Sequence, residues 1–333
     1  METIKKSNKL GKALPYIILV VIALFLPFVT KTRFWLNIFV VVMFKMIGSV
    51  SLRTLGLSGN MSFAQGAFVG VGAYVTGMMA RWLGLPPYLT IPAGALAALI
   101  LGVVTGFPFV RLRNTYFCMA SMFLGVTIVY IISAGGVNFT GGGNGLTKIP
   151  AMFSNTRAYY YFFLGLTIFS CAVMYRFEFS RIGTTLRALS QSPEVAASIG
   201  ISETLYRLLA VGVGCFFAGL SGACYALYST ALSPNSYGMS YTLWLIMYMM
   251  IGGQDDFLGP IVGTILLVII PEYFRSFGTY APFASAAALV LVAYFLPGGL
   301  VSLPRVIKDA IVRAKDHKTE AKEEVQSIPG GGE

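Results

Sequence analysis

The chain has 333 residues, of which 56% are hydrophobic and 11% are charged. Soluble proteins carry about 25% charged residues, so this chain has too little charge to cover a water-facing surface. Together with a mean hydropathy of +0.75, this composition indicates an integral membrane protein and excludes water-soluble enzymes. The net charge of +11 would suggest nucleic-acid binding in a soluble protein, but here its distribution along the chain matters more.

Ten apolar stretches are candidates for membrane spans, because crossing ~30 Å of hydrocarbon takes roughly 20 helical residues. In chain order they are 14–30, 34–52, 62–80, 88–110, 116–134, 158–176, 206–231, 240–254, 259–274 and 281–300. The predicted fold is therefore an all-α integral membrane protein, a polytopic helical bundle of about 10 transmembrane segments. The stretches at 240–254 and 259–274 are short and glycine-rich where they meet. They can instead form a re-entrant hairpin, which leaves about 8 spans.

Lysines and arginines are divided unequally between the two sides of these spans. With alternating spans and a cytoplasmic N-terminus, 17 of the 24 fall on the cytoplasmic side, 6 fall outside and Lys45 lies within a span. The positive-inside rule then predicts that both termini are cytoplasmic. The positive charge reflects this topology, so we expect membrane lipid and no nucleic acid around the chain. We divide it into a transmembrane domain, 1–304, and a charged cytoplasmic tail, 305–333, expected to be largely disordered.

Glycines cluster inside the spans, where small residues allow helices to approach closely in lipid. Gly66, Gly70 and Gly72 lie in the third stretch, and Gly102-xxx-Gly106 and Gly259-xxx-Gly263 repeat the same spacing. These positions predict close helix–helix contacts.

Few polar residues occur within the spans. Lys45 lies about 12 Å along a helix from Arg53, so its ammonium group either snorkels to the cytoplasmic surface or faces a transport pathway. Asn60 and Gln65, where the chain enters the third stretch, are two further candidates for a pathway lining. The four cysteines lie in apolar stretches and the single histidine, His317, lies in the tail. The sequence therefore predicts neither a metal site nor a catalytic centre.

The longest cytoplasmic loop, about 177–205, contains a short predicted helix with signals at both ends. Ser192 is placed to cap it, Pro193 occupies the first helical position and Glu194 complements the helix dipole. Gly200 is placed to adopt the left-handed conformation that ends a helix. With small alanines exposed, this helix either docks into a groove on another protein or is a capped linker. The residues concerned are Ser192, Pro193, Glu194, Val195, Ala196, Ala197, Ile199 and Gly200.

The longest outer loop, about 135–157, contains a glycine-rich stretch formed by Gly141, Gly142, Gly143, Asn144 and Gly145. It resembles a phosphate-binding loop only superficially, because the GxxxxGK[ST] spacing and the preceding β-strand are missing and the loop is predicted to lie outside the cell. We therefore expect no ATPase site and no bound cofactor in this chain.

Eight segments of the chain carry a family resemblance. They are Leu55–Tyr74, Arg111–Phe117, Thr140–Leu146, Ser180–Gly183, Glu194–Gly200, Phe217–Ala223, Ile251–Gly253 with Gly259–Pro260, and Leu296–Leu300. In this order and spacing they resemble the LivM-type permease subunit of ABC importers for branched-chain amino acids.

The resemblance implies that Glu194, Ala196, Ala197 and Gly200 belong to a coupling loop that meets a nucleotide-binding subunit. This chain has one residue more, Val195, than the Glu-Ala-Ala form of that loop. The resemblance further implies two cytoplasmic ATP-binding subunits that use ATP and Mg, a second permease subunit, and an extracytoplasmic substrate-binding protein facing loop 135–157. It places the chain in a bacterial-type plasma membrane and implies alternating access driven by ATP.

Two alternatives remain open at the level of sequence. Permeases of urea and short-amide importers are similar in sequence, so the sequence predicts the type of transporter more specifically than it predicts the substrate. A stand-alone secondary transporter would need buried carboxylates, and the predicted spans offer Glu272 at an edge, three residues from Arg275. The spans also lack the polar cluster that a membrane-embedded enzyme would need.

Overall fold

The computed structural model describes residues 19–27, 33–112, 114–137, 139–153, 155–254 and 256–275, together with residues 283 and 287. These residues are mostly helical, and they contain one isolated antiparallel bridge between Leu146 and Leu232. The α-helices are α2 (Arg33–Gly56), α3 (Gln65–Trp82), α4 (Pro87–Phe109), α5 (Asn114–Ala134), α6 (Thr156–Glu178), α7 (Arg181–Gln191), α8 (Pro193–Ser198), α9 (Glu203–Ser229), α10 (Met239–Gly252) and α11 (Leu258–Phe274). Two 3-10 helices, η1 (Gly142–Asn144) and η2 (Pro234–Tyr237), lie in connecting loops. The all-α class predicted from the sequence is confirmed for this part of the chain.

Among the described residues, five helices are long and apolar enough to cross a membrane: α2, α4, α5 over Thr115–Ala134, α6 and α9. Each coincides with a predicted stretch, and α3, α10 and α11 coincide with three more. The first predicted stretch is described as helix over 19–27. The last, 281–300, and the tail, 305–333, lie outside the described residues apart from 283 and 287. The total of ten spans and the side on which the termini lie therefore stay predictions.

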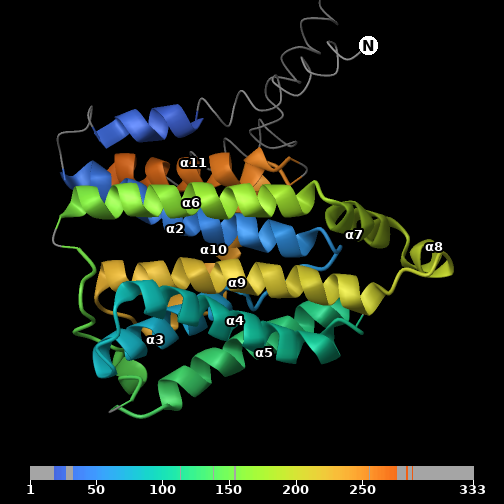
Figure 1. The fold of residues 1–333 in the computed structure, drawn as a ribbon, viewed down its shortest axis with the longest axis horizontal. Helices are drawn as coiled ribbons and strands as arrows, with labels where there is room; N and C mark the ends of the chain where they lie inside the picture. Colours follow the sequence, from blue (N-terminus) through green and yellow to red (C-terminus); the bar gives the residue numbers. More distant parts are fainter. Residues whose placement is uncertain are drawn as a thin grey trace, which may run out of the picture.

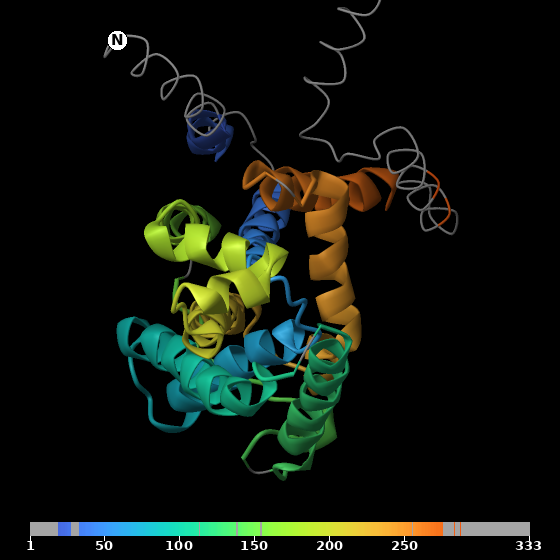
Figure 2. The ribbon, with the colours of Figure 1, turned by 90° about the vertical axis from the view of Figure 1, so that its right-hand side faces the viewer.

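The long helices lie side by side along one axis of the molecule (Figure 1). We call its two ends the α7–α8 end and the η1–η2 end, after the short elements found there. Helix α9 packs against α2, α3 and α4, whereas α6 packs mainly on α2. Helix α5 lies at the margin (Figure 2), and half of its residues from Thr115 to Ala134 are exposed.

Glycines explain why α3, α4 and α9 pack so closely. A Cβ atom at Gly72 would overlap the backbone of Gly219, and one at Gly222 would overlap the carbonyl oxygen of Val69. On α4, a Cβ at Gly102 would lie 2.5 Å from Sγ of Cys215. Since lipid offers little hydrophobic drive for helix association, such contacts supply the packing energy. The predicted role of these glycines in helix packing is confirmed.

Helices α10 and α11 form a hairpin that differs from the rest of the bundle. Figure 2 shows α10 running across the view, while α6 and α9 are seen nearly end-on. Gly252 of α10 touches the backbone of Gly259, and Gly263 touches the carbonyl oxygen of Tyr248. With 14 residues, α10 is about 21 Å long, shorter than the hydrocarbon core of a bilayer. A helix of this length is too short to cross the core by itself, which favours the predicted re-entrant hairpin over two full spans.

Candidate functional site

Helix α7 turns sharply away from the end of α6. The side chain of Ser180 caps it by accepting a hydrogen bond from the backbone N–H of Gly183 at 3.4 Å. Gly183 is required there because a Cβ would overlap the carbonyl oxygen of Glu178. Leu186 and Leu189 are fully buried, so one face of α7 packs against the bundle. This helix was not predicted from the sequence, although Ile182, Leu186 and Leu189 have the i, i+4, i+7 spacing that indicates one.

Helix α8 follows after one residue and has the ends that the sequence predicted in position. Ser192 is the residue before the helix, Pro193 is its first residue, and Gly200 has φ +83°. The predicted side-chain cap is wrong, however, since Ser192 makes no capping hydrogen bond through its side chain. Its backbone N–H already donates to the carbonyl oxygen of Ala188 and closes the last turn of α7. Ser192 is therefore both the last capping residue of α7 and the residue that precedes α8, and its backbone conformation is determined by α7.

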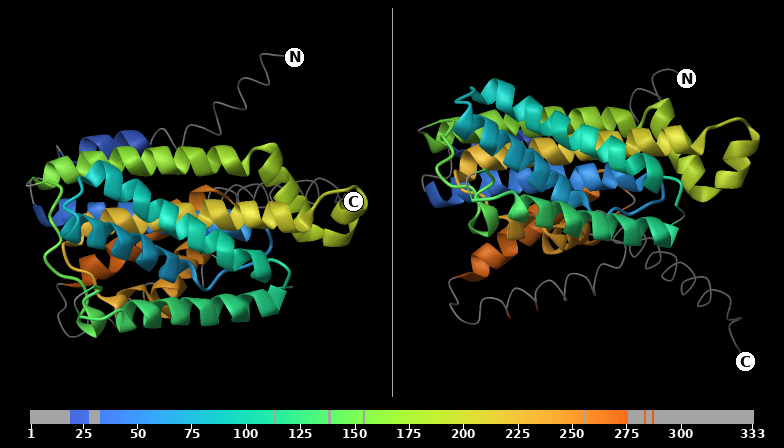
Figure 3. Two further views of the ribbon diagram at one scale, coloured as in Figure 1. Left: turned by 60° about the horizontal axis from the view of Figure 1, so that its bottom comes forward. Right: turned by 90° about the horizontal axis from the view of Figure 1, so that it is seen from below.

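The α7–α8 unit projects past the ends of the long helices, as both views of Figure 3 show. Val195 is 64% exposed and Ile199 is 72% exposed, and Glu194 and Ala197 are exposed as well. The expectation that both alanines are exposed is wrong for Ala196, which is 3% exposed. Its carbonyl oxygen accepts a hydrogen bond from the N–H of Ile201 at 3.2 Å, which turns this face of α8 toward the chain leading into α9. The outer face therefore presents an acidic side chain beside two apolar ones.

A buried ion cluster lies where α7 meets the bundle, and sequence reasoning missed it. Glu178, the last residue of α6, is 1% exposed. Arg53 of α2 binds it in a bidentate manner, with Nη2 to Oε1 at 2.7 Å and Nε to Oε2 at 3.2 Å. Arg187 of α7 donates from Nη2 to the same Oε1 at 2.5 Å. Arg53 also donates from Nη1 to the carbonyl oxygen of Gln254, between α10 and α11. The cluster thus joins four separate parts of the chain.

No pattern in the sequence indicated this cluster. The charge count placed Arg53 and Arg187 on the cytoplasmic side, and Glu178 was assigned to the cytoplasmic loop at 177–205. In the chain, 125 positions separate Arg53 from Glu178. Only the folded chain brings them together.

The turn formed by residues 57–64, between α2 and α3, packs beside the cluster. Gly59 has φ +81°, and a Cβ there would lie 3.0 Å from Cβ of Ser190 on α7. Leu57 packs with Leu186 and Ala210. On its other side, the N–H of Phe63 donates to Oγ of Ser121 on α5 at 3.0 Å. This turn therefore lies between α7 and α5.

The predicted pathway residues Asn60 and Gln65 are buried in or next to this turn, at 2% and 0% exposure. Nε2 of Gln65 donates to Oγ of Ser51 at 2.8 Å and to the carbonyl oxygen of Gly214 at 3.1 Å. The amide oxygens of both side chains have no hydrogen-bond partner among the described residues. Gln65 therefore binds α2 and α9 together, and the two free acceptors mark a polar region inside the bundle.

Lys45, the third predicted pathway residue, lies near the middle of α2. Its Nζ atom is 5.8 Å from the ring centroid of Tyr248 on α10, a cation–π distance. The ammonium group is held against an aromatic face at the α2–α10 contact, whereas Gln65 faces α9.

The glycine-rich loop lies at the η1–η2 end, and most of its glycines serve the backbone. Gly141, Gly142 and Gly145 all have positive φ, and Cβ atoms at Gly141 and Gly145 would overlap backbone oxygens. The next residue, Leu146, forms two hydrogen bonds with Leu232, at 2.9 and 2.8 Å, which fasten the loop to the segment after α9. Only Gly143 and Asn144 of the five predicted residues are exposed. Under this loop, burial and the neighbouring Tyr225 raise the pKa of Tyr237 well above its usual value.

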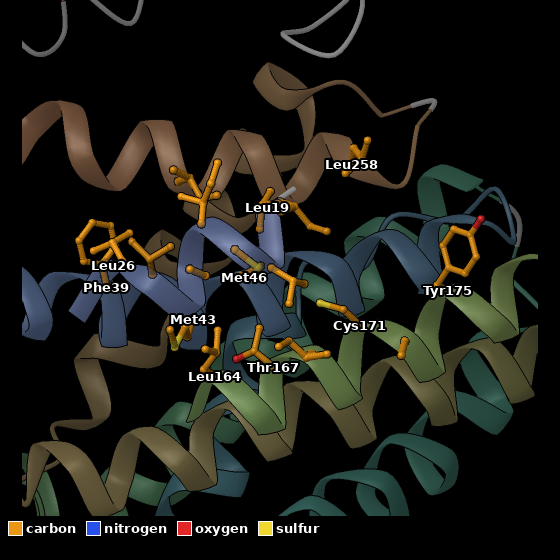
Figure 4. Close-up of a pocket in the computed structure, with 18 of the residues that line it drawn as sticks. Leu19, Leu26, Phe39, Met43, Met46, Leu164, Thr167, Cys171, Tyr175 and Leu258 are labelled. Carbon is orange, nitrogen blue, oxygen red and sulfur yellow. The ribbon is translucent and has the colours of Figure 1, made fainter. Parts of the chain in front are cut away.

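An apolar cavity of about 500 Å³ lies between segment 19–27, α2, α6 and α11. Figure 4 shows aliphatic and aromatic side chains converging on it, among them Leu26, Phe39 and Met46. Thr167 contributes a buried hydroxyl without a hydrogen-bond partner among the described residues. A solute with an ammonium and a carboxylate group needs several placed polar partners, so this cavity does not fit one. Among the described residues, no three His, Cys, Asp or Glu side chains form a group that could hold a metal.

Comparison with known proteins identifies the class. Residues 34–300 match the family described as "Branched-chain amino acid transport system / permease component". The match covers most of the chain, from the second residue of α2 through α11, so this chain belongs to that family of multi-pass membrane permeases.

Two curated relatives are similar over most of their length. Both are described as "High-affinity branched-chain amino acid transport system permease protein LivM", one from Salmonella typhimurium and one from Escherichia coli. Each is 27% identical to this chain over 317 residues, which covers 86% of this chain and 74% of the relative. No solved structure matches the chain. The resemblance to a LivM-type permease is confirmed.

Proposed function

We propose that this chain is the membrane-spanning permease subunit of an ATP-driven importer that moves branched-chain amino acids into the cell. The observation that carries the proposal is the α7–α8 unit. It projects from one end of a bundle of transmembrane-length helices, with Glu194, Val195 and Ile199 exposed at its tip. A short helix with exposed apolar residues at the end of a membrane protein is suited to fit a groove on a partner.

The remaining assignments follow from this one. The α7–α8 end faces the cytoplasm, where two ATP-binding subunits contact α8 and hydrolyse ATP with Mg. The η1–η2 end faces outward, and Gly143 and Asn144 lie on the surface offered to a substrate-binding protein. A second permease subunit completes the pathway in the plasma membrane of a bacterial-type cell. Asn60, Gln65 and Lys45 are the polar candidates for its lining.

The first test is to purify the chain in mild detergent from its native membrane and identify the proteins that accompany it. We expect two ATP-binding subunits and a second permease subunit. Purified components reconstituted in vesicles should then take up labelled leucine only with ATP and with the binding protein outside. Uptake that persists without ATP and follows a proton gradient would overturn the proposal in favour of a secondary transporter. Urea uptake in place of leucine uptake would correct the cargo alone.

A second test acts on α8 itself. Gly200→Pro cannot adopt φ +83°, because proline fixes φ near −65°, so the end of α8 must change direction. We expect normal insertion into the membrane, while ATP hydrolysis no longer drives uptake. Full leucine transport by this variant would contradict the assignment of α8 as the coupling element.

A further inference from the structure

The buried ion cluster has a layout that stability does not explain. Burying an ion pair costs desolvation energy that its attraction only partly recovers, so apolar residues of similar size would hold these helices as well or better. Yet the carboxylate of Glu178 accepts hydrogen bonds from two arginines. These arginines come from α2 and α7, and Arg53 reaches on to the α10–α11 link.

The two arginine contacts differ in burial. The side chain of Arg53 is 5% exposed, and its guanidinium forms a bidentate contact with Glu178. The side chain of Arg187 is 42% exposed and has one contact to the same carboxylate, with its guanidinium carbon 5.3 Å from the ring centroid of Phe179. Arg53 therefore forms a fixed joint inside the bundle. Arg187 forms the ionic contact between α7 and Glu178, at the surface of the bundle.

Helix α7 carries this surface joint and also supports α8. It begins three residues after Glu178 and ends at Gln191, so that a single residue separates it from α8. On the same helix, Ser190 packs against Gly59 of the turn at 57–64. A displacement of α8 is therefore transmitted through α7 to two contacts with the bundle. One is the ionic contact of Arg187 with Glu178, and the other is the packing of Ser190 on Gly59.

We propose that Glu178 is a positioning residue that makes α7, α2 and the α10–α11 link move as one unit when α8 is displaced. This inference rests on the proposed function, because it assigns the route by which a partner ATPase acting at α8 reaches the helices. Attraction between charges falls off slowly with distance. An ionic joint can therefore stay connected through a shift that would break close apolar packing.

The test is the ratio of leucine taken up to ATP hydrolysed in vesicles that contain the complete transporter. Glu178→Gln keeps the shape of the side chain and removes its charge. We expect this ratio to fall about fivefold or more, as for the loss of a typical coupling energy, while ATP hydrolysis continues. Glu178→Asp keeps the charge and should restore much of the ratio. A purely structural role would instead lower the amount of assembled transporter and leave the ratio unchanged.

Two further variants keep the test decisive. Glu272→Gln is the matched control, since it breaks an ion pair of the same 2.7 Å length with Arg275 on the surface of α11, and its ratio should equal that of the wild type. Arg187→Gln removes only the partly exposed contact of Arg187 with Glu178. It therefore tests the inference even if the Glu178→Gln transporter fails to assemble. A lowered ratio in Arg187→Gln supports the inference, and an unchanged ratio overturns it. If the wild-type chain shows no ATP-driven uptake, the proposed function itself fails, whatever the variants do.

Discussion

The centre of the bundle and its α7–α8 end are held together by different forces. In the centre, α3, α4 and α9 touch through glycines, so that backbone packs on backbone at a single separation. At the α7–α8 end, Glu178 joins α2, α6 and α7 through charged side chains. Close packing loses about a quarter to a half of its contact energy within about 1 Å of displacement, whereas charge attraction falls off slowly over several ångströms. We therefore expect the centre formed by α3, α4 and α9 to be rigid and the α7–α8 end to be able to move.

The largest expected effect comes from removing one partner, Arg53, of the buried ion pair with Glu178. Arg53→Met leaves the carboxylate of Glu178 buried without its bidentate partner, which should cost about 3–5 kcal/mol of unfolding free energy. Thermal unfolding can be followed by labelling of the buried Cys215 and Cys224, both 0% exposed. The double variant Arg53→Met with Glu178→Met should recover most of the loss, because no unpaired charge remains buried. Equal losses in the single and double variants would contradict this account.

Gly72→Ala tests the rigid centre. The added Cβ overlaps the backbone of Gly219, so α3 and α9 must move apart, at a cost of about 1–3 kcal/mol. The same cysteine-labelling assay measures it. If the centre tolerates the alanine with no loss, the helices are free to slide and the contrast with the α7–α8 end disappears.

Gly145→Ala tests the loop at the opposite end. Its φ of +82° costs an alanine about 1–2 kcal/mol, and the added Cβ would overlap the carbonyl oxygen of Leu232. We expect the hydrogen bonds between Leu146 and Leu232 to be lost, with faster tryptic cleavage after the exposed Lys148. Gly143→Ala, at a site with open space around it, is the matched control and should be cleaved at the wild-type rate.

The smallest expected effect is a gain in stability instead of a loss. Gly165 lies inside α6, and a Cβ atom added there would have no neighbouring atom within 4 Å among the described residues. Gly165→Ala should therefore stabilise the protein by about 0.5–1 kcal/mol, because alanine loses less conformational entropy in a helix. A loss of stability in the cysteine-labelling assay would contradict this expectation and show that this face of α6 is closely packed.

Much of the fold could be read from apolar stretches, because the bilayer demands helices of a minimum length. All eight predicted stretches between 34 and 274 are helices in the structure. Helix α7 was missed because it is amphipathic and short, and a search for apolar runs does not detect such a helix. Its alternation of buried leucines with exposed polar residues carried the signal.

The candidate site was predicted in part. Pro193 and Gly200 have local roles at the ends of α8, and the sequence placed both correctly because proline and glycine act through their own backbone angles. Ser192 was assigned a side-chain cap that it does not make, and its backbone N–H closes the last turn of α7 instead. Ala196 was expected on the surface, but the turn into α9 buries it. Both errors arose where a neighbouring element changed the surroundings of a correctly placed residue.

The sequence by itself determined the membrane location, the apolar helices, the ends of α8 and the family, because each depends on composition, local backbone preference or an ordered set of motifs. The tertiary structure alone decided that Arg53, Glu178 and Arg187 form one buried cluster and that Gly72 meets Gly219. Such contacts join residues that are distant in the chain, and their energy arises only once helices have packed and water has been excluded. No local pattern records which partner a buried charge or a glycine will meet.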